Sequence, residues 1–285
     1  MEVALTIVRH GETMFNKKRI IQGQGIDTPL SDEGLRQARA AGDFLADIAF
    51  THVYSSDLQR ALQTAEAILE RNKRSCAHKI EVDSRLRERS YGLAEGKPVE
   101  ELRAMARAVG QACPEYNPPG AENLQQLKQR VLEFFHSLCD SLAPVQFCSG
   151  ELPLTINGNV SSTRKPQTVE SMSSTTQTEI SPLETGSLHQ AESQNEGPGG
   201  DLGAEVLVVS HGGTIRQWIQ HLVHDLSCAI PPGTHSRLNV VSPNTGLSRF
   251  LLVLPGGGRP PTSILCIYLH HRQHLQDKDS PTVPL

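Results

Sequence analysis

The chain of 285 residues lacks the positive charge typical of nucleic-acid-binding proteins and the long apolar runs of membrane-spanning proteins. It carries 27 Lys and Arg against 31 Asp and Glu, a net charge of -4, so it has no general positive field to hold nucleic acid or an anionic membrane. Its apolar runs, such as 264–269, are far shorter than the ~18 residues that suggest a membrane span. We therefore expect no nucleic-acid partner and no integral membrane segment, and an anionic substrate would have to be collected by local arginines.

Cofactor and export signals are also missing from the sequence. The six cysteines form no Cys-x-x-Cys pair, which favours a reduced compartment, and the N-terminus lacks the basic start and long apolar stretch of a signal peptide. The histidines His270, His271 and His274 have no acidic or thiol partner at a diagnostic spacing, so no metal site is predicted. No Walker loop or complete dinucleotide-binding glycine motif occurs. We expect a soluble cytoplasmic protein with no cofactor.

Aromatic residues make up only 4% of the chain, and none lies between Phe147 and Trp218. Residues 149–203, within this gap, repeat Ser, Thr, Glu, Gln and Gly. Such a segment has few apolar side chains to offset the entropy lost on ordering. We interpret 149–203 as a flexible Ser/Thr-rich insertion in a single domain that covers 1–285.

Outside this insertion, short β-branched runs alternate with stretches of helical periodicity. Helices are predicted after Ser31 and Ser56 as capping residues, at 99–109, at 124–142 and from 212 to about 226. Strands are predicted at 3–8, 52–55, 80–83, 206–209, 247–254 and 264–270. This alternation predicts a three-layer α/β/α domain with a mostly parallel sheet, in which ligands bind beyond the carboxyl ends of the strands.

Two histidines follow predicted strands and are expected at that edge. Arg9, His10 and Gly11 end the first strand; imidazole can attack phosphorus, and arginine both orients phosphate and disfavours the imidazolium form. His211 precedes a helix, where a second imidazole and the helix N-terminus could both stabilise a transferred phosphoryl group. The alternative for each histidine is a purely structural role at a strand end.

Arg60 and Glu88 complete the candidate catalytic set. The planar guanidinium of Arg60 suits bidentate contact with phosphate, although an ordinary surface arginine is the alternative. Glu88 lies in the charged run 85–89 and could protonate a leaving alkoxide and then deprotonate a water molecule. Considered alone, this run is equally typical of a solvated face.

These motifs, in this order, resemble the histidine phosphatase superfamily, which includes cofactor-dependent phosphoglycerate mutase. The resemblance covers 3–148 and about 204–270, and the runs 20–25, 86–92, 102–106 and 243–246 are similar to fructose-2,6-bisphosphatases within it. It implies that His10 is the phosphorylated nucleophile, Glu88 the proton donor and acceptor, and His211 a transition-state stabiliser. It also implies that Arg9 and Arg60 clamp the phosphate and that no metal is needed.

The resemblance further implies a helical cap, built largely by 92–142, and a substrate pocket. Positions matching the pocket are Asn16, Gln22, Gly23 and Tyr91. Glu122 is a further candidate for substrate binding, although residues 120–123 depart from the family's usual Gly-Gly-Glu pattern.

The implied activity is a metal-independent phosphatase for a small phosphorylated metabolite, which would lower glycolytic flux. Fructose 2,6-bisphosphate and 2,3-bisphosphoglycerate are the candidate substrates. A phosphomutase, which keeps water out and returns the phosphoryl group to a second acceptor, is one alternative. A non-catalytic phospholigand-binding or partner-binding protein is the other. A monomer is expected, and the resemblance also allows nuclear or mitochondrial association.

Overall fold

The computed structural model describes residues 1–77, 79–142, 203–256 and 259–275. The insertion predicted at 149–203 therefore lies outside the described residues, except for Gly203. Within the described ranges, no helix is both long and apolar enough to cross a membrane.

Six strands form one mixed sheet in the order β3-β2-β4-β1-β5-β6. They are β1 (Glu2–Arg9), β2 (His52–Ser55), β3 (Ile80–Val82), β4 (Ala204–Ser210), β5 (Leu247–Val253) and β6 (Ser263–His271). The first four are parallel, whereas β5 runs antiparallel to both β1 and β6. The mostly parallel α/β sheet is thus confirmed. The pair β5 and β6 is antiparallel because the connection between these two strands is too short for a crossover.

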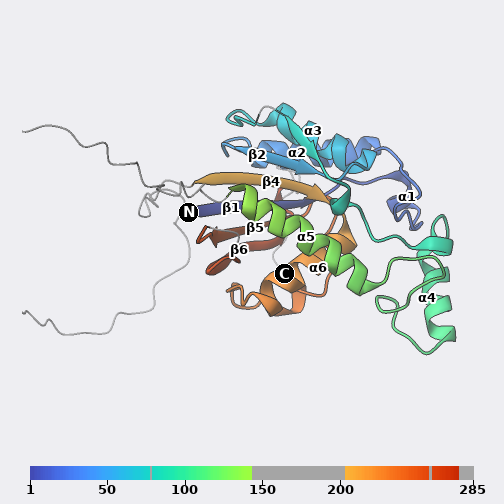
Figure 1. Ribbon diagram of the computed structural model, residues 1–285. Coiled ribbons are helices and arrows are strands. Elements are labelled where there is room, and N and C mark those ends of the chain that lie inside the picture. Colours follow the sequence, from blue (N-terminus) through green and yellow to red (C-terminus); the bar gives the residue numbers. More distant parts are fainter. Residues whose placement is uncertain (78, 143–202, 257–258, 276–285) are drawn as a thin grey trace, which may run out of the picture. The chain divides into compact units, whose positions relative to one another are not determined.

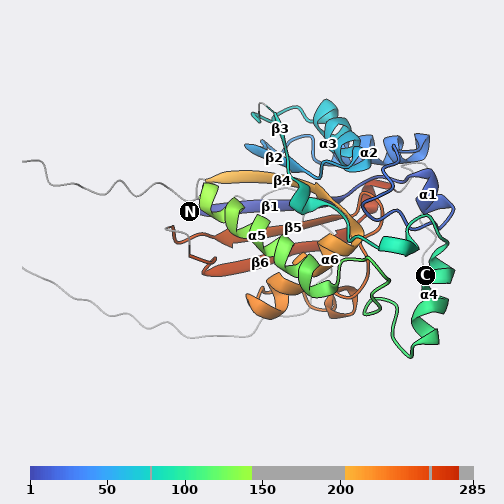
Figure 2. The same ribbon diagram turned by 45° about the vertical axis from the view of Figure 1, so that its right-hand side comes forward.

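Helices cover both faces of this sheet (Figures 1 and 2). On one face lie α2 (Asp32–Phe44) and α3 (Gln59–Arg71), and on the other α5 (Leu124–Leu142) and α6 (Gly212–Gln220). Successive strand side chains point to opposite faces, so Leu5 and Ile7 pack with α5 and α6 whereas Val8 packs with α2 and α3. The result is the three-layer arrangement that the sequence predicts.

The helix starts confirm one predicted cap and correct the other. Ser31 caps α2, since its side chain accepts the N–H of Gly34 at 3.1 Å. The prediction for Ser56 is wrong, because α3 begins at Gln59 with Leu58 as its N-cap. The N–H of Gln59 instead donates to the Asp27 carboxylate at 2.8 Å. The hydroxyl of Ser56 therefore does not cap α3, and it contacts another element as well as the N–H of Leu58.

The range predicted as a cap, 92–142, contains two helices that pack differently. Helix α4 (Val99–Ala108) belongs to a small cluster in which Leu102 packs with Ile21 and Ala94. Helix α5 instead places Phe134 in the main core, 5.6 Å from the ring of Trp218. In Figure 1, α4 and the short α1 (Met14–Lys17) lie beyond the carboxyl ends of β1 and β4. The part of this range that lies beyond the sheet edge therefore precedes α5.

Candidate active site

His10 and His211 meet at the carboxyl edge of the sheet. Strands β1 and β4 are neighbours with Arg9 opposite Ser210, so the two following histidines lie side by side, with ring centroids 5.1 Å apart. Both side chains are buried. The Nδ1 atom of His10 lies 2.7 Å from the carbonyl oxygen of Gly11, which can only accept a hydrogen bond. Nδ1 therefore carries the proton of the neutral ring, and Nε2 keeps its lone pair.

The surroundings of both histidines favour the neutral imidazole. Burial, followed by the positive charges of Arg9 and Arg60, holds the pKa of His10 well below its ordinary value. Burial and Arg60 are the main causes of the similarly lowered pKa of His211. A neutral imidazole beside two guanidinium groups is the form that can attack phosphorus.

Both arginines offer unused donors beside His10. Backbone carbonyls orient them: Arg9 donates to Ser242 at 2.7 Å, and Arg60 donates to Gly23 at 2.8 Å. The Nε atom of each arginine is buried without a partner among the described residues. Buried polar groups nearly always have a hydrogen-bond partner, and a bound anion beside His10 would supply one to two positively charged groups.

Glu88 lies at the N-terminus of α6. Both of its carboxylate oxygens accept the N–H of Gly213 at 3.1 Å, and Oε1 also accepts those of Thr214 at 3.3 Å and Arg89 at 2.8 Å. The hydroxyl of Thr214 donates to the carbonyl of Arg87 at 2.6 Å, which fixes the backbone next to Glu88. The sequence predicts that this helix N-terminus stabilises a phosphoryl group. In the structure it binds the carboxylate of Glu88 instead.

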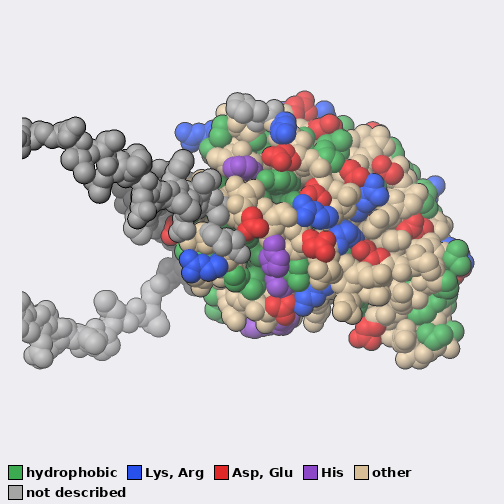
Figure 3. Space-filling view, in the orientation of Figure 1, with side chains coloured by type: hydrophobic (Ala, Val, Ile, Leu, Met, Phe, Trp, Pro, Cys, Tyr) green, Lys and Arg blue, Asp and Glu red, His purple; other side chains and the backbone are tan. Residues whose placement is uncertain are grey.

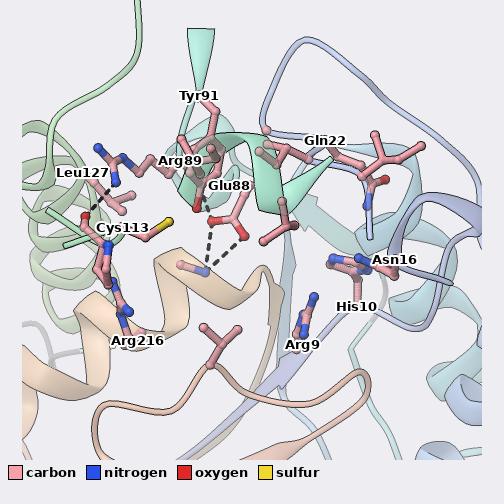
Figure 4. Close-up of a pocket in the computed structure, with 18 of the residues that line it drawn as sticks. Arg9, His10, Asn16, Gln22, Glu88, Arg89, Tyr91, Cys113, Leu127 and Arg216 are labelled. Carbon is pink, nitrogen blue, oxygen red and sulfur yellow. Dashed lines mark hydrogen bonds between the residues drawn. The ribbon is translucent and has the colours of Figure 1, made fainter. Parts of the chain in front are cut away.

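A cavity of about 420 Å³ extends from these residues (Figure 4). Its wall includes all four pocket residues implied by the family resemblance and four members of the candidate catalytic set: Asn16, Gln22, Gly23, Tyr91, Arg9, His10, Arg60 and Glu88. His211 is not among the residues of this wall, but its ring lies next to the ring of His10. The remaining wall is mainly apolar, with Ile20, Ile21, Val99, Leu102, Leu127 and Val241.

Comparison with known proteins identifies the family of this chain. The family model described as the histidine phosphatase superfamily (branch 1) matches residues 5–149. The chain belongs to the histidine phosphatase superfamily. It is 45% identical over 273 residues to fructose-2,6-bisphosphatase TIGAR of Bos taurus, which covers 95% of this chain and 96% of that relative. It is 43% identical over 282 residues to the Xenopus tropicalis protein of the same name, covering 98% and 97%.

Solved structures support the fold of this histidine phosphatase. Phosphoglycerate mutase from Bacillus anthracis matches with a TM-score of 0.59 at 21% identity, over 90% of this chain and 93% of that chain. The fold and family inferred from the strand-end motifs are therefore confirmed.

Glu122, predicted to bind substrate, does not line the cavity of this histidine phosphatase. Its carboxylate pairs with Arg130 at 2.7 Å. Arg130 in turn donates to the carbonyls of Arg85 and Arg87 at 2.6 and 2.9 Å. These hydrogen bonds hold the backbone just before Glu88, so the pair of Glu122 and Arg130 supports the position of Glu88.

Two residues of the site escaped the sequence analysis. Arg216 lines the cavity three residues after Gly213, so the periodicity of α6 could have identified it. Glu95 accepts the N–H groups of Gly25 at 2.7 Å and Tyr91 at 2.8 Å, which joins two loops of the pocket. The contact with Gly25 joins residues 70 apart in sequence, and no local pattern could have shown it.

Proposed function

We propose that this histidine phosphatase hydrolyses small bisphosphorylated sugars through a phosphorylated His10, with fructose 2,6-bisphosphate as the first substrate to test. The observation that carries the proposal is the buried, neutral His10 between two arginines with unpartnered Nε donors at the wall of a cavity. The names of the relatives, fructose-2,6-bisphosphatases, supply the substrate class.

The reaction has two balanced steps. In the first, Nε2 of His10 attacks phosphorus, the N–P bond forms and the P–O bond to the sugar breaks, while the protonated Glu88 carboxyl gives its proton to the leaving oxygen. In the second, a water oxygen attacks phosphorus and the N–P bond breaks. Glu88 takes the proton of that water and is ready for another cycle. Arg9, Arg60 and His211 stabilise the charge on the transferred group in both steps.

Arg216 supports the preference for a second phosphate. Three arginines of the cavity wall lie outside the candidate catalytic set, and two of them are engaged: Arg103 pairs with Glu100 at 2.9 Å, and Arg89 donates to the carbonyls of Glu122, Pro114 and Tyr116. Arg216 forms no ion pair within the described part of the chain. Arg216 and His10 both line the cavity and lie on opposite sides of the view in Figure 4. Arg216 can therefore bind the phosphate that is not transferred.

The proposal is tested by phosphate release from fructose 2,6-bisphosphate and from 2,3-bisphosphoglycerate, with a chelator present. We expect release by the wild type and by His136→Ala, which changes an exposed histidine on α5, and none by His10→Ala. Isomerised product without free phosphate would indicate the phosphomutase. Binding of either compound without any turnover would indicate the non-catalytic alternative.

We propose in addition that the protein is a cytoplasmic monomer. On the face shown in Figure 3, acidic and basic side chains are interspersed, as on the surface of a soluble protein without a polyanionic partner. Size-exclusion chromatography with light scattering, and imaging of the tagged full chain, test the two parts of this proposal.

A further inference from the structure

A buried hydroxyl contacts the second histidine of the site. Ser56 follows β2 and His211 follows β4, and because these strands pair in parallel, both residues lie at the same edge of the sheet. The Oγ atom of Ser56 is 2.8 Å from Nε2 of His211. Both residues have 0% of their surface exposed. No water is therefore at hand to satisfy either group, and the direction of this hydrogen bond matters.

The other contacts of Ser56 determine that direction. Its Oγ already accepts the N–H of Leu58 at 3.3 Å. Among the described residues, His211 Nε2 is the acceptor that its hydroxyl proton can reach. If Nε2 carried a proton and donated it to Oγ, two buried groups would lack a partner, namely the hydroxyl proton of Ser56 and the lone pair of His211 Nδ1, whereas in the opposite direction only the Nδ1–H group does. Each buried group without a partner costs roughly 1–3 kcal/mol. The hydroxyl therefore donates to Nε2, which must be unprotonated.

This direction assigns the proton of His211. A neutral imidazole carries one proton, so an unprotonated Nε2 leaves it on Nδ1. The Nδ1 atom is buried and has no partner in the described part of the chain. Burial and Arg60 lower the pKa of His211, which favours the neutral ring. His211 therefore carries a covered N–H donor that no described protein group uses, on a ring whose centroid is 5.1 Å from that of His10.

We propose that Ser56 is a positioning residue that holds His211 in the Nδ1–H tautomer, so that this N–H donates to the phosphoryl group in transfer to and from His10. The opposite tautomer would present a nitrogen lone pair to a phosphoryl oxygen and repel it. A neutral histidine can thereby act as a donor in a site whose charge is already supplied by arginines. The catalytic part of this inference rests on the proposed function, whereas the tautomer does not.

The tautomer is measured directly in the wild-type full chain. Two-dimensional ¹⁵N–¹H spectra of the histidine rings near neutral pH distinguish a protonated Nδ1 from a protonated Nε2, and the signal that disappears in His211→Gln belongs to His211. We expect protonated Nδ1 and unprotonated Nε2, and a shift of the Nδ1–H resonance when inorganic phosphate is added. A protonated Nε2, or an imidazolium ring, would overturn the inference whether or not the protein is active.

Two matched variants test the role in turnover. Ser55 is as buried as Ser56, but its hydroxyl donates to the carbonyl of Ser56 at 2.9 Å and does not contact His211. We expect Ser56→Ala to lower kcat by about 10- to 100-fold, with KM within about threefold, and to weaken the Nδ1–H signal. Ser55→Ala should keep both kcat and the signal.

The outcomes separate this inference from the proposed function. Equal losses of kcat in the two variants would indicate a merely structural role for Ser56. A wild-type kcat in Ser56→Ala would also overturn the inference. If the wild type hydrolyses neither bisphosphate, the proposed function fails, and the spectrum of His211 still decides the tautomer. If Ser56→Ala does not fold, the wild-type spectrum alone decides it.

Discussion

Replacing Glu88 by glutamine removes the proton donor while nearly preserving the shape of the side chain. The carboxylate now accepts from the backbone of Gly213, Thr214 and Arg89. A glutamine can place its oxygen at the position of Oε1, but its NH₂ group at the position of Oε2 then faces the N–H of Gly213. All three N–H groups keep a bond to an oxygen at the Oε1 position, so we expect a loss of stability of only about 1 kcal/mol, because bonds to a charged carboxylate become bonds to a neutral amide oxygen.

The kinetic effect of Glu88→Gln should be larger and should differ between the two steps. General acid–base catalysis contributes about 10²- to 10⁴-fold, or roughly 3–5 kcal/mol of barrier. An aryl phosphate such as p-nitrophenyl phosphate has a leaving group that needs no proton, so formation of the phosphohistidine should stay fast. Attack by water still needs the base and should slow by that factor. The phosphorylated enzyme should therefore accumulate.

Rapid mixing and mass spectrometry measure this accumulation. Glu88→Gln should release a burst of about one nitrophenolate per active site and gain the mass of one phosphoryl group, which acid treatment should remove. Glu133→Gln, on the exposed side of α5, should behave as the wild type. If Glu88→Gln shows no burst and hydrolyses fructose 2,6-bisphosphate within about threefold of the wild-type rate, Glu88 is not the acid and base.

Three further predictions concern the substrate, the core and pH. Arg216→Ala should raise KM for fructose 2,6-bisphosphate by about 10-fold or more, as loss of a charged hydrogen bond predicts, and leave KM for an aryl monophosphate unchanged; equal increases for both would contradict a second phosphate site. Phe134→Ala should lower the free energy of unfolding by about 3–5 kcal/mol in urea titrations, and a loss below about 1 kcal/mol would contradict its place in the core. Because the folded pKa of His10 and of His211 is lowered, the stability they contribute is complete above about pH 6.5 and is lost as pH falls, by up to about 1.4 kcal/mol per unit for each. Urea titrations of His10→Asn between about pH 6.5 and 5 should show a slope smaller by one proton than that of the wild type, and identical slopes would refute this origin.

Local patterns were enough to predict the sheet and the two histidines. The β-branched run before His10 and the similar run before His211 both form buried strands, β1 and β4. A parallel sheet then places polar residues that follow such strands at one edge, whatever their distance in sequence. The helices α2 and α5 were predicted for the same reason, since their apolar spacing depends only on nearby residues.

The roles of the polar residues around the histidines were decided by tertiary structure. Glu88 and Gly213 are 125 residues apart, and Ser56 and His211 are 155 apart, yet each pair is joined by a hydrogen bond. The same kind of long-range contact turns Glu122 toward Arg130 and away from the cavity.

The sequence by itself therefore determined the elements, their order and the edge at which the histidines lie, because hydrophobic periodicity and strand-end polarity are local properties of the chain. Only the tertiary structure decided which donor each carboxylate or hydroxyl would meet. A buried polar group must find a partner in the folded chain, and a serine or glutamate forms equally good bonds with many different partners. That choice depends on where the packed helices and strands place their termini, which no short stretch of sequence records.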